Sequence, residues 1–444
     1  MSEAYAARQP EHAPVDISVP EVLGGRPRLP ADDPFHQPPV GFESMPLGSV
    51  LRAREVRVAF FGLVPQRVRA TQLLFRTSGA DGEPMAAVTT VLTPTGSAAQ
   101  PGSRPVVSYQ CAIDAITSRC FPSYALLRGA VAFGALAQVE YLVIASLLAR
   151  GWAVAIPDHE GPQGLWGMPR MPGYITLDGL RAAVAHDGLA VHADDPIALW
   201  GYSGGGLASA WAAELWAHYA PELNVVGAVL GSPVGDLGNT YSRLNGGLFS
   251  GLPAMVVSAL SQVYPDLQRV LAEHATARGR ARLQRLSRMT TVEAVLRFLF
   301  SDMGRMLDRP LTEILALPEV RAVFEAIRLG RSIPQMPVLV IQSATDLIMS
   351  AGDIDDLVQT YRDGGADVTY HREPLGEHIL LHPISTPLAL RWLSDRFRGR
   401  STDADRRGSG PAWPTVLTPT GARGLLTLAG VAVRVATGRT LSSH

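Results

Sequence analysis

The stretch IALWGYSGGG, residues 197–206, decides the fold of this chain. It opens with apolar residues typical of a short buried strand, and helical spacing follows over residues 207–218. Between them stands the pattern Gly-x-Ser-x-Gly, centred on Ser203, in which Gly201 and Gly205 let the backbone pass close to itself. A glycine-rich turn with an ordinary serine is one interpretation. The strand–turn–helix context favours the other, in which Ser203 is a nucleophile.

The composition is that of a globular protein. Of the 444 residues, 47% are hydrophobic and 18% charged, and the formal net charge is −1. So small a net charge gives no general attraction for nucleic acid, and no nucleic-acid partner is expected. The sequence contains no zinc-ligand spacing, no phosphate-binding loop and no dinucleotide fingerprint.

Strand patterns flank the opening stretch on both sides. The alternating segments 56–61, 70–76 and 85–92 predict early, largely antiparallel strands. From residue 104 onward strands alternate with helices, which is typical of a parallel sheet covered on both faces. The strands predicted there are 106–109, 152–157, 197–200, 225–230, 338–341 and 368–371, and two of the helices are 141–150 and 174–186. The predicted fold class is therefore α/β with a mostly parallel sheet.

A long helical insertion interrupts this alternation. We predict a tail over residues 1–32, a core over 33–233 and 335–400, a helical cap over 234–334, and a C-terminal flap or tail over 401–444. A connection as long as the cap needs structure of its own. Its five arginines at positions 278, 280, 282, 285 and 288 form a solvated helix face or, in the alternative, attract an anionic lipid surface.

Both ends of the chain carry weaker signals. Residues 33–43 predict an ordered, extended arm. Residues 416–437 are apolar but broken by arginines and glycines, which favours a surface flap with no stable membrane span over a weak membrane contact. The start of the sequence lacks the charged and apolar regions of a secretory signal, so the sequence as it stands predicts a cytoplasmic protein. Cys111 and Cys120 are two free thiols or a single pair.

A nucleophilic serine needs a base and an orienting acid, which follow it along the chain in hydrolases of this pattern. Asp346 comes just after the predicted strand 338–341 and is the expected acid. His378 follows the last predicted strand by a short loop and is the expected base. His382 competes with it, although its place on the following helix makes it less suitable. The other carboxylates nearby, Asp353, Asp355, Asp356 and Glu377, are interpreted as structural.

An oxyanion hole needs two backbone donors. One is expected from Gly204, directly after the nucleophile. The other is expected from the loop 110–115 after the strand 106–109, where Asp114 is the candidate through its backbone. An aspartate is an unusual neighbour for a developing oxyanion unless it is protonated or points away.

Several short motifs occur in an order that points to a known family. They are Asp33-Pro34-Phe35, Gly41-Phe42-Glu43-Ser44, Ser108-Tyr109-Gln110, Cys120-Phe121-Pro122-Ser123-Tyr124, Pro157-Asp158-His159-Glu160-Gly161, Gly201-Tyr202-Ser203-Gly204-Gly205, Asp346 and Gly376-Glu377-His378. With these motifs the chain resembles the secretory lipases of the Candida antarctica lipase A type, over about residues 33–395. The resemblance implies an α/β-hydrolase core with a helical cap, an oxyanion hole formed by Asp114 and Gly204, and no metal or organic cofactor.

The chain departs from that family in two respects. Family members are exported and carry a disulfide that joins the region of Cys120 to the cap, whereas here the start of the sequence shows no secretory signal and the cap has no cysteine. The predicted function is a serine esterase or lipase that cleaves triacylglycerols or other apolar acyl esters, with a transient contact between the cap and a lipid surface. The alternatives are an acyltransferase with the same triad and a lipid-binding protein of this fold without turnover.

Overall fold

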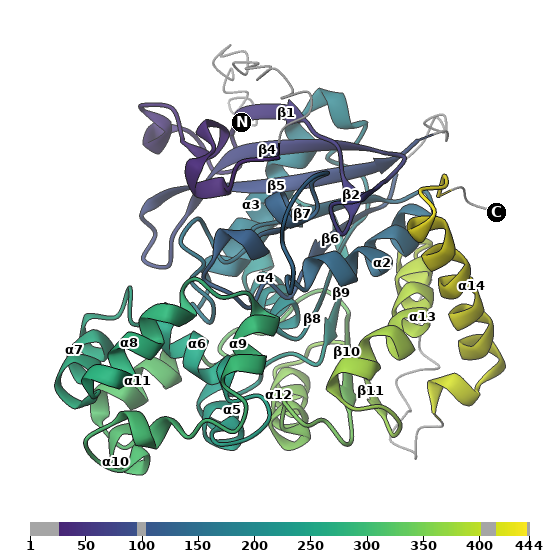
Figure 1. Ribbon diagram of the computed structural model, residues 1–444. Coiled ribbons are helices and arrows are strands. Elements are labelled where there is room, and N and C mark those ends of the chain that lie inside the picture. The colour runs from purple at the N-terminus through teal and green to yellow at the C-terminus, as the bar shows by residue number, and fades with distance from the viewer. Residues whose placement is uncertain (1–25, 96–103, 401–413, 442–444) are drawn as a thin grey trace, which may run out of the picture.

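The computed structural model describes residues 26–95, 104–400 and 414–441, and a nine-stranded mixed sheet forms its centre (Figure 1). The order is β1-β4-β5-β7-β6-β8-β9-β10-β11. Their bounds are β1 Val50–Glu55, β4 Val68–Ser78, β5 Pro84–Pro94, β6 Val106–Gln110, β7 Ala153–Pro157, β8 Ile197–Tyr202, β9 Val225–Gly231, β10 Val338–Ser343 and β11 Val368–Glu373. Strands β1, β4, β5 and β7 pair antiparallel, and β7, β6, β8, β9, β10 and β11 pair parallel. The predicted mostly parallel sheet is confirmed.

The first predicted strand, 56–61, is wrong. β1 ends at Glu55, and Ala59–Phe60 (β2) pairs instead with Val64–Pro65 (β3) in a separate two-stranded ribbon. The reason is local, because Phe61 and Gly62 both have positive φ, 50° and 70°, and turn the chain back at once. The predicted strands 70–76 and 85–92 lie within β4 and β5, which are antiparallel as expected.

Helices cover both faces of the sheet. α3 (Met171–Ala185) and α4 (Gly204–Tyr219) pack on one face, and α2 (Ala137–Leu148) and α13 (His378–Phe397) pack on the other, while α12 (Ala351–Asp363) contacts β10 and β11 (Figure 1). α1 (Pro122–Ala125) is a single turn, and η4 (Ser118–Cys120) and η5 (Asp187–Leu189) are short 3₁₀ helices. Because both faces are covered, every residue of β6, β7 and β8 is buried.

Residues 234–334, the segment predicted to form the cap, fold mainly into helices. The elements of this segment are α5 Leu237–Leu244, α6 Gly251–Leu260, α7 Pro265–His274, α8 Ala277–Leu286, α9 Thr291–Arg297, η6 Met303–Met306, α10 Leu311–Leu315 and α11 Pro318–Ala326. They gather at one end of the sheet, at the lower left of Figure 1. All of these residues are described, and they contain no strand beyond an isolated bridge between Ala275 and Leu307.

The N-terminal arm is not extended as predicted. It forms three short 3₁₀ helices, η1 (Pro30–Asp32), η2 (Pro34–His36) and η3 (Phe42–Ser44). A proline starts each of the first two, where its fixed φ suits a helical turn. Asp33 caps η2 by accepting the Phe35 N–H and also pairs with Arg54 at 2.7 Å. Of the predicted tail, residues 1–25 lie outside the described residues.

The C-terminal segment packs on the body of the protein. Pro419–Ala436 forms α14, which follows η8 (Thr415–Leu417) and lies against α13 and α2, with Val431 and Val435 buried (Figure 1). Within the described residues, no helix has the length and apolar character needed to cross a membrane. Residues 401–413 and 442–444 of the predicted flap lie outside the described part.

Cys111 and Cys120 are both buried and both free. The interpretation of two unpaired thiols is therefore confirmed. Burial raises the pKa of the Cys120 thiol to about 12, so the group stays protonated.

Candidate active site

Ser203 stands at the turn between β8 and α4, as the sequence predicts. Its backbone has φ 54° and ψ −119°, a strained conformation for a residue with a side chain. The flanking glycines are needed for space. A Cβ on Gly201 would lie 2.1 Å from the Gly205 carbonyl oxygen, and a Cβ on Gly205 would lie 1.9 Å from the Gln110 carbonyl oxygen.

His378 is the histidine that reaches Ser203. Its Nε2 lies 2.9 Å from Ser203 Oγ, and its Nδ1 lies 2.8 Å from Asp346 Oδ2. The residue starts α13, where Glu377 caps the helix by accepting the Ile379 and Leu380 N–H groups. By fixing where α13 begins, Glu377 also fixes the position of the His378 imidazole. This agrees with a structural role for Glu377.

Asp346 lies on the loop after β10 and is held by many donors. Its Oδ1 accepts the N–H groups of Ile348 and Met349 at 2.8 and 2.7 Å. Its Oδ2 accepts from the Ser232 hydroxyl at 2.8 Å and from Gln342 at 3.0 Å. Burial would raise the pKa of this carboxyl, but the hydrogen bonds from His378 and Ser232 outweigh burial and lower it. The carboxylate is therefore ionised and can orient His378.

His382 makes other contacts. Its ring stacks on Tyr202 with centroids 4.3 Å apart, and its Nε2 lies 3.1 Å from the Tyr109 hydroxyl. Burial, together with the charge of His378, lowers its pKa to about 3. The competing assignment of His382 as the base therefore has no support in the geometry.

Asp353, Asp355 and Asp356 all lie on α12, but only Asp353 is in its first turn, where the helix dipole favours a carboxylate. The Asp353 N–H is capped by Ser350 in the first turn of α12, and the Asp353 carboxylate accepts from Asn239. Asp355 accepts from the Tyr370 hydroxyl and pairs with Arg372 at 2.9 Å. None of these contacts involves Ser203 or His378.

The opposite side of Ser203 is built from Gly204 and the loop after β6. Gly204 is the first residue of α4, so its N–H belongs to the donors that a helix leaves unpaired at its start. Asp114 faces it, since a Cβ built on Gly204 would lie 1.8 Å from Asp114 Oδ1. The Asp114 N–H, which the sequence pattern assigns to an oxyanion, is donated here to Glu160 Oε1 at 3.0 Å.

Burial favours the protonated form of both carboxyls on this side. It raises the pKa of Asp114 to about 7. It raises the pKa of Glu160 well above its usual range, with a further increase from the charge of Asp114. Among the described residues, Asp114 Oδ1, Glu160 Oε2 and the Trp166 indole nitrogen are buried without a hydrogen-bond partner.

Sequence reasoning gave no role to Ser232, Glu160 or Trp166. Ser232 follows β9 and Glu160 follows β7, so both stand at carboxyl ends of parallel strands, where the ends of neighbouring strands meet. That position is the signal that could have identified them. Trp166 lies on a loop without a sequence signal.

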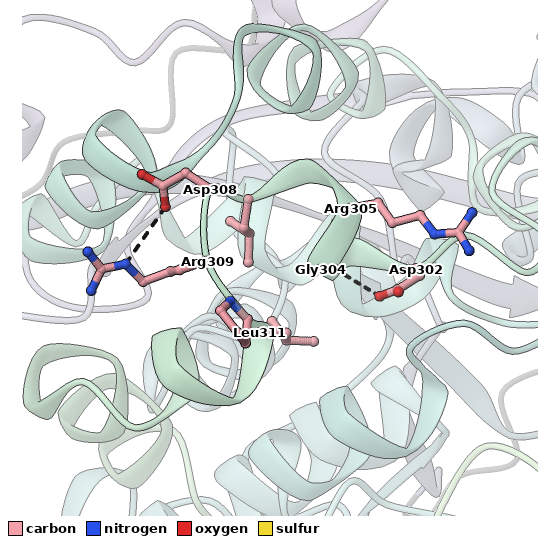
Figure 2. Close-up of a pocket in the computed structure, with 8 residues that line it drawn as sticks. Asp302, Gly304, Arg305, Asp308, Arg309 and Leu311 are labelled. Carbon is pink, nitrogen blue, oxygen red and sulfur yellow. Dashed lines mark hydrogen bonds and ion pairs between the residues drawn. The ribbon is translucent and has the colours of Figure 1, made fainter.

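A hollow on the cap lies apart from these residues. Its lining includes Asp302, Arg305, Asp308 and Arg309, and Figure 2 shows the Asp308–Arg309 ion pair at its edge. No residue of the candidate site contributes to it. Among the described residues, no three histidine, cysteine or acidic side chains come together as metal ligands.

Comparison with known proteins agrees with the geometry. Residues 127–404 match the secretory lipase family. The chain belongs to this family. Lipase A of Arthroderma benhamiae is 35% identical over 87% of this chain and 83% of its own length. As a secretory lipase relative, this chain is a carboxylic ester hydrolase of the lipase and esterase class.

A solved structure and a second sequence relative are also similar to this chain. The X-ray structure of Candida antarctica lipase A superposes with a TM-score of 0.81 at 26% identity, covering 94% of this chain and 98% of that one. The secretory lipase chain described here therefore has the predicted α/β-hydrolase fold. A Mycobacterium tuberculosis protein that is 54% identical over 94% of this chain and 93% of its own length carries the name probable inactive lipase.

Proposed function

We propose that this secretory lipase hydrolyses apolar acyl esters, triacylglycerols among them, with Ser203 as nucleophile, His378 as base and Asp346 as orienting acid. One observation carries the proposal. The atoms Ser203 Oγ, His378 Nε2, His378 Nδ1 and Asp346 Oδ2 form a continuous chain with separations of 2.9 and 2.8 Å across the two contacts. Such a chain lets the imidazole accept the serine proton while the carboxylate stabilises the charged ring.

The reaction proceeds in two halves. In the first, Ser203 Oγ bonds to the ester carbonyl carbon, its proton passes to His378 Nε2, and the carbonyl electron pair moves to the oxygen. The tetrahedral species then expels the alcohol, which leaves with the proton from His378. In the second half, water attacks the acyl-serine, His378 takes and returns a proton, and the carboxylic acid leaves with Ser203 restored.

The oxyanion of each tetrahedral species needs donors on the other side of Ser203. We assign the N–H groups of Gly204 and Asp114. The Asp114 N–H is bonded to Glu160 in this structure, but the raised pKa of Glu160 favours a neutral carboxyl, which is a weak acceptor. A developing negative charge competes well for the same N–H, and an N–H can be shared between two acceptors.

The composition of the cap surface favours an apolar substrate. Leu296, Leu299 and Phe300 lie exposed on it, and the arginine-rich α8 packs in the same segment. Apolar side chains beside arginines suit a transient contact with an anionic lipid surface. The cap would then deliver an acyl ester to Ser203 and limit the entry of water.

An ester panel tests the proposal. p-Nitrophenyl esters from acetate to palmitate, and a triacylglycerol emulsion, are offered to wild type and to Ser203→Ala, with labelling by a fluorophosphonate as a second readout. We expect turnover and labelling of wild type only, with Ser203→Ala slower by about 10⁴-fold or more. Turnover of the alanine variant at the wild-type rate would contradict the assignment. Addition of a long-chain alcohol separates hydrolysis from acyl transfer by its products.

One finding favours a second candidate, a lipid-binding protein without turnover. A mycobacterial relative, 54% identical to this chain, is named a probable inactive lipase. The same experiment separates the two candidates, because a folded wild type that neither labels nor turns over would support the second.

A further inference from the structure

The loop that carries Asp114 needs external support. Asp114 has φ 47°, a left-handed conformation that is unfavourable for a residue with a side chain. The loop has no regular secondary structure between β6 and η4. Its conformation is therefore fixed by hydrogen bonds from other segments. In one of these, the Asp114 N–H donates to Glu160 Oε1.

Another support comes from the cap. The hydroxyl of Thr291 donates to the carbonyl oxygens of Ile113 and Asp114, at 3.0 and 3.2 Å. Thr291 is the first residue of α9 and is 3% exposed. Ile113 and Asp114 precede Thr291 in the chain by 178 and 177 positions.

The start of α9 is firmly attached to the core. Thr290 and Glu293 form a capping box, in which each side chain accepts the other residue's backbone N–H. Glu293 also pairs with Arg119 of the core at 3.2 Å, and Arg119 donates to the Arg288 carbonyl at 2.6 Å. These contacts hold the Thr291 hydroxyl in a defined place against the loop.

The contact to Ile113 bears on the chemistry because of peptide geometry. The Ile113 carbonyl and the Asp114 N–H belong to one planar peptide group and point in opposite directions. A donor on the carbonyl therefore sets the direction of the N–H. It also polarises the peptide, which makes the N–H a better donor.

We propose that Thr291 is a positioning residue, a cap hydroxyl that fixes the orientation of the Ile113–Asp114 peptide, whose N–H is bonded to Glu160 and is shared with the oxyanion next to Gly204 during the reaction. The inference rests on the proposed function and adds a part to it. It also means that the position of the cap controls the conformation of the oxyanion loop, because displacement of α9 breaks both contacts of Thr291. A cap that opened at its α9 end would lower oxyanion stabilisation as well as expose Ser203.

Thr291→Val tests this, since valine keeps the side-chain volume and removes the hydroxyl. The matched control is Thr276→Val, which removes another cap hydroxyl that donates to a backbone carbonyl, that of Met306 at 3.2 Å, with no contact to the loop. The readouts are kcat and KM on p-nitrophenyl butyrate, the Ki of an alkyl boronic acid that forms a tetrahedral adduct with the serine, and the thermal unfolding midpoint.

We expect Thr291→Val to lower kcat about tenfold and raise the boronic acid Ki by a similar factor, with KM within about twofold of wild type. Thr291→Ser should restore both values, and Thr276→Val should leave both unchanged. If the valine variant unfolds at the assay temperature, the kcat ratio of Thr291→Ser to Thr291→Ala isolates the hydroxyl instead.

Wild-type kcat and Ki in Thr291→Val, or equal losses in Thr276→Val, would overturn the inference while Ser203-dependent turnover of wild type upheld the proposed function. Absence of Ser203-dependent turnover in wild type would overturn both.

Discussion

The two sides of Ser203 differ in how their polar atoms are paired. On the base side, both oxygens of Asp346 accept hydrogen bonds, and both ring nitrogens of His378 have partners. On the oxyanion side, three polar atoms, from Asp114, Glu160 and Trp166, are buried without a partner among the described residues. Buried polar atoms without partners destabilise a fold, so their concentration at one place calls for a functional reason.

This difference in hydrogen-bond pairing matches the different tasks of the two sides in catalysis. The base side must be organised before substrate arrives, because the imidazole has to be in the correct tautomer to accept the serine proton. The oxyanion side must instead receive a charge that exists only during the reaction. Neutral carboxyls and unpaired donors suit that task, since they add no negative charge beside the oxyanion.

The largest expected effect on kcat comes from a substitution on the base side of Ser203. Asp346→Asn should lower kcat by about 10⁴-fold with the fold intact, because an amide can donate to His378 Nδ1 and so hold the wrong tautomer. Rates on p-nitrophenyl butyrate and circular dichroism measure both properties. Asp353→Asn is the matched control on the same segment, and it should keep kcat within about twofold. A loss below tenfold for Asp346→Asn would mean that another carboxylate orients the base.

An intermediate effect concerns the charge of the oxyanion side. Burial raises the pKa of Asp114 to about 7, so this carboxyl is neutral below that pH and negative above it. We expect kcat/KM of wild type to fall by about tenfold as pH rises from 6 to 9, because a carboxylate beside Gly204 opposes the oxyanion. Asp114→Asn, which cannot ionise, should remove that fall. An unchanged pH profile in the variant would assign the alkaline loss to another group.

The same carboxyl affects stability in a direction fixed by its pKa. The folded state keeps the Asp114 proton up to about pH 7, whereas the unfolded chain releases it near its ordinary value of 3.8. The folded state therefore binds more protons between these values, and its stability falls as pH rises through them. Asp114→Asn should flatten the slope of the unfolding midpoint against pH over this range, which thermal melts at pH 4 to 8 would measure.

The smallest expected effect on kcat also comes from a substitution on the base side, at Ser232. Ser232→Ala removes one donor to Asp346 Oδ2, but Gln342 and the backbone donors to Oδ1 remain. We expect kcat to fall only about threefold to tenfold, in line with the loss of one hydrogen bond to a charged group that keeps others. Ser350→Ala, at the start of α12, is the control. A loss as large as that of Asp346→Asn would show that Ser232 itself holds the tautomer.

Local signals accounted for most of what the sequence could predict. The turn at Ser203 was readable because the strand, the glycines and the helix are adjacent in the chain. Asp346 was readable because it follows the continuous apolar run 338–341, and His378 because it follows the last predicted strand, 368–371, by a short loop. The predicted strand 56–61 failed for a related reason, since its alternation continues through a turn at Phe61 and Gly62 that periodicity does not detect.

By itself, the sequence determined the α/β class, the helical character of the cap and the order of Ser203, Asp346 and His378. Tertiary structure alone decided that Glu160 takes the Asp114 N–H and that Thr291 reaches the loop from the cap. The physical reason is range. Periodicity and turn chemistry act over a few neighbouring residues, whereas these contacts join segments far apart in the chain, and their geometry is set by sheet register and helix packing.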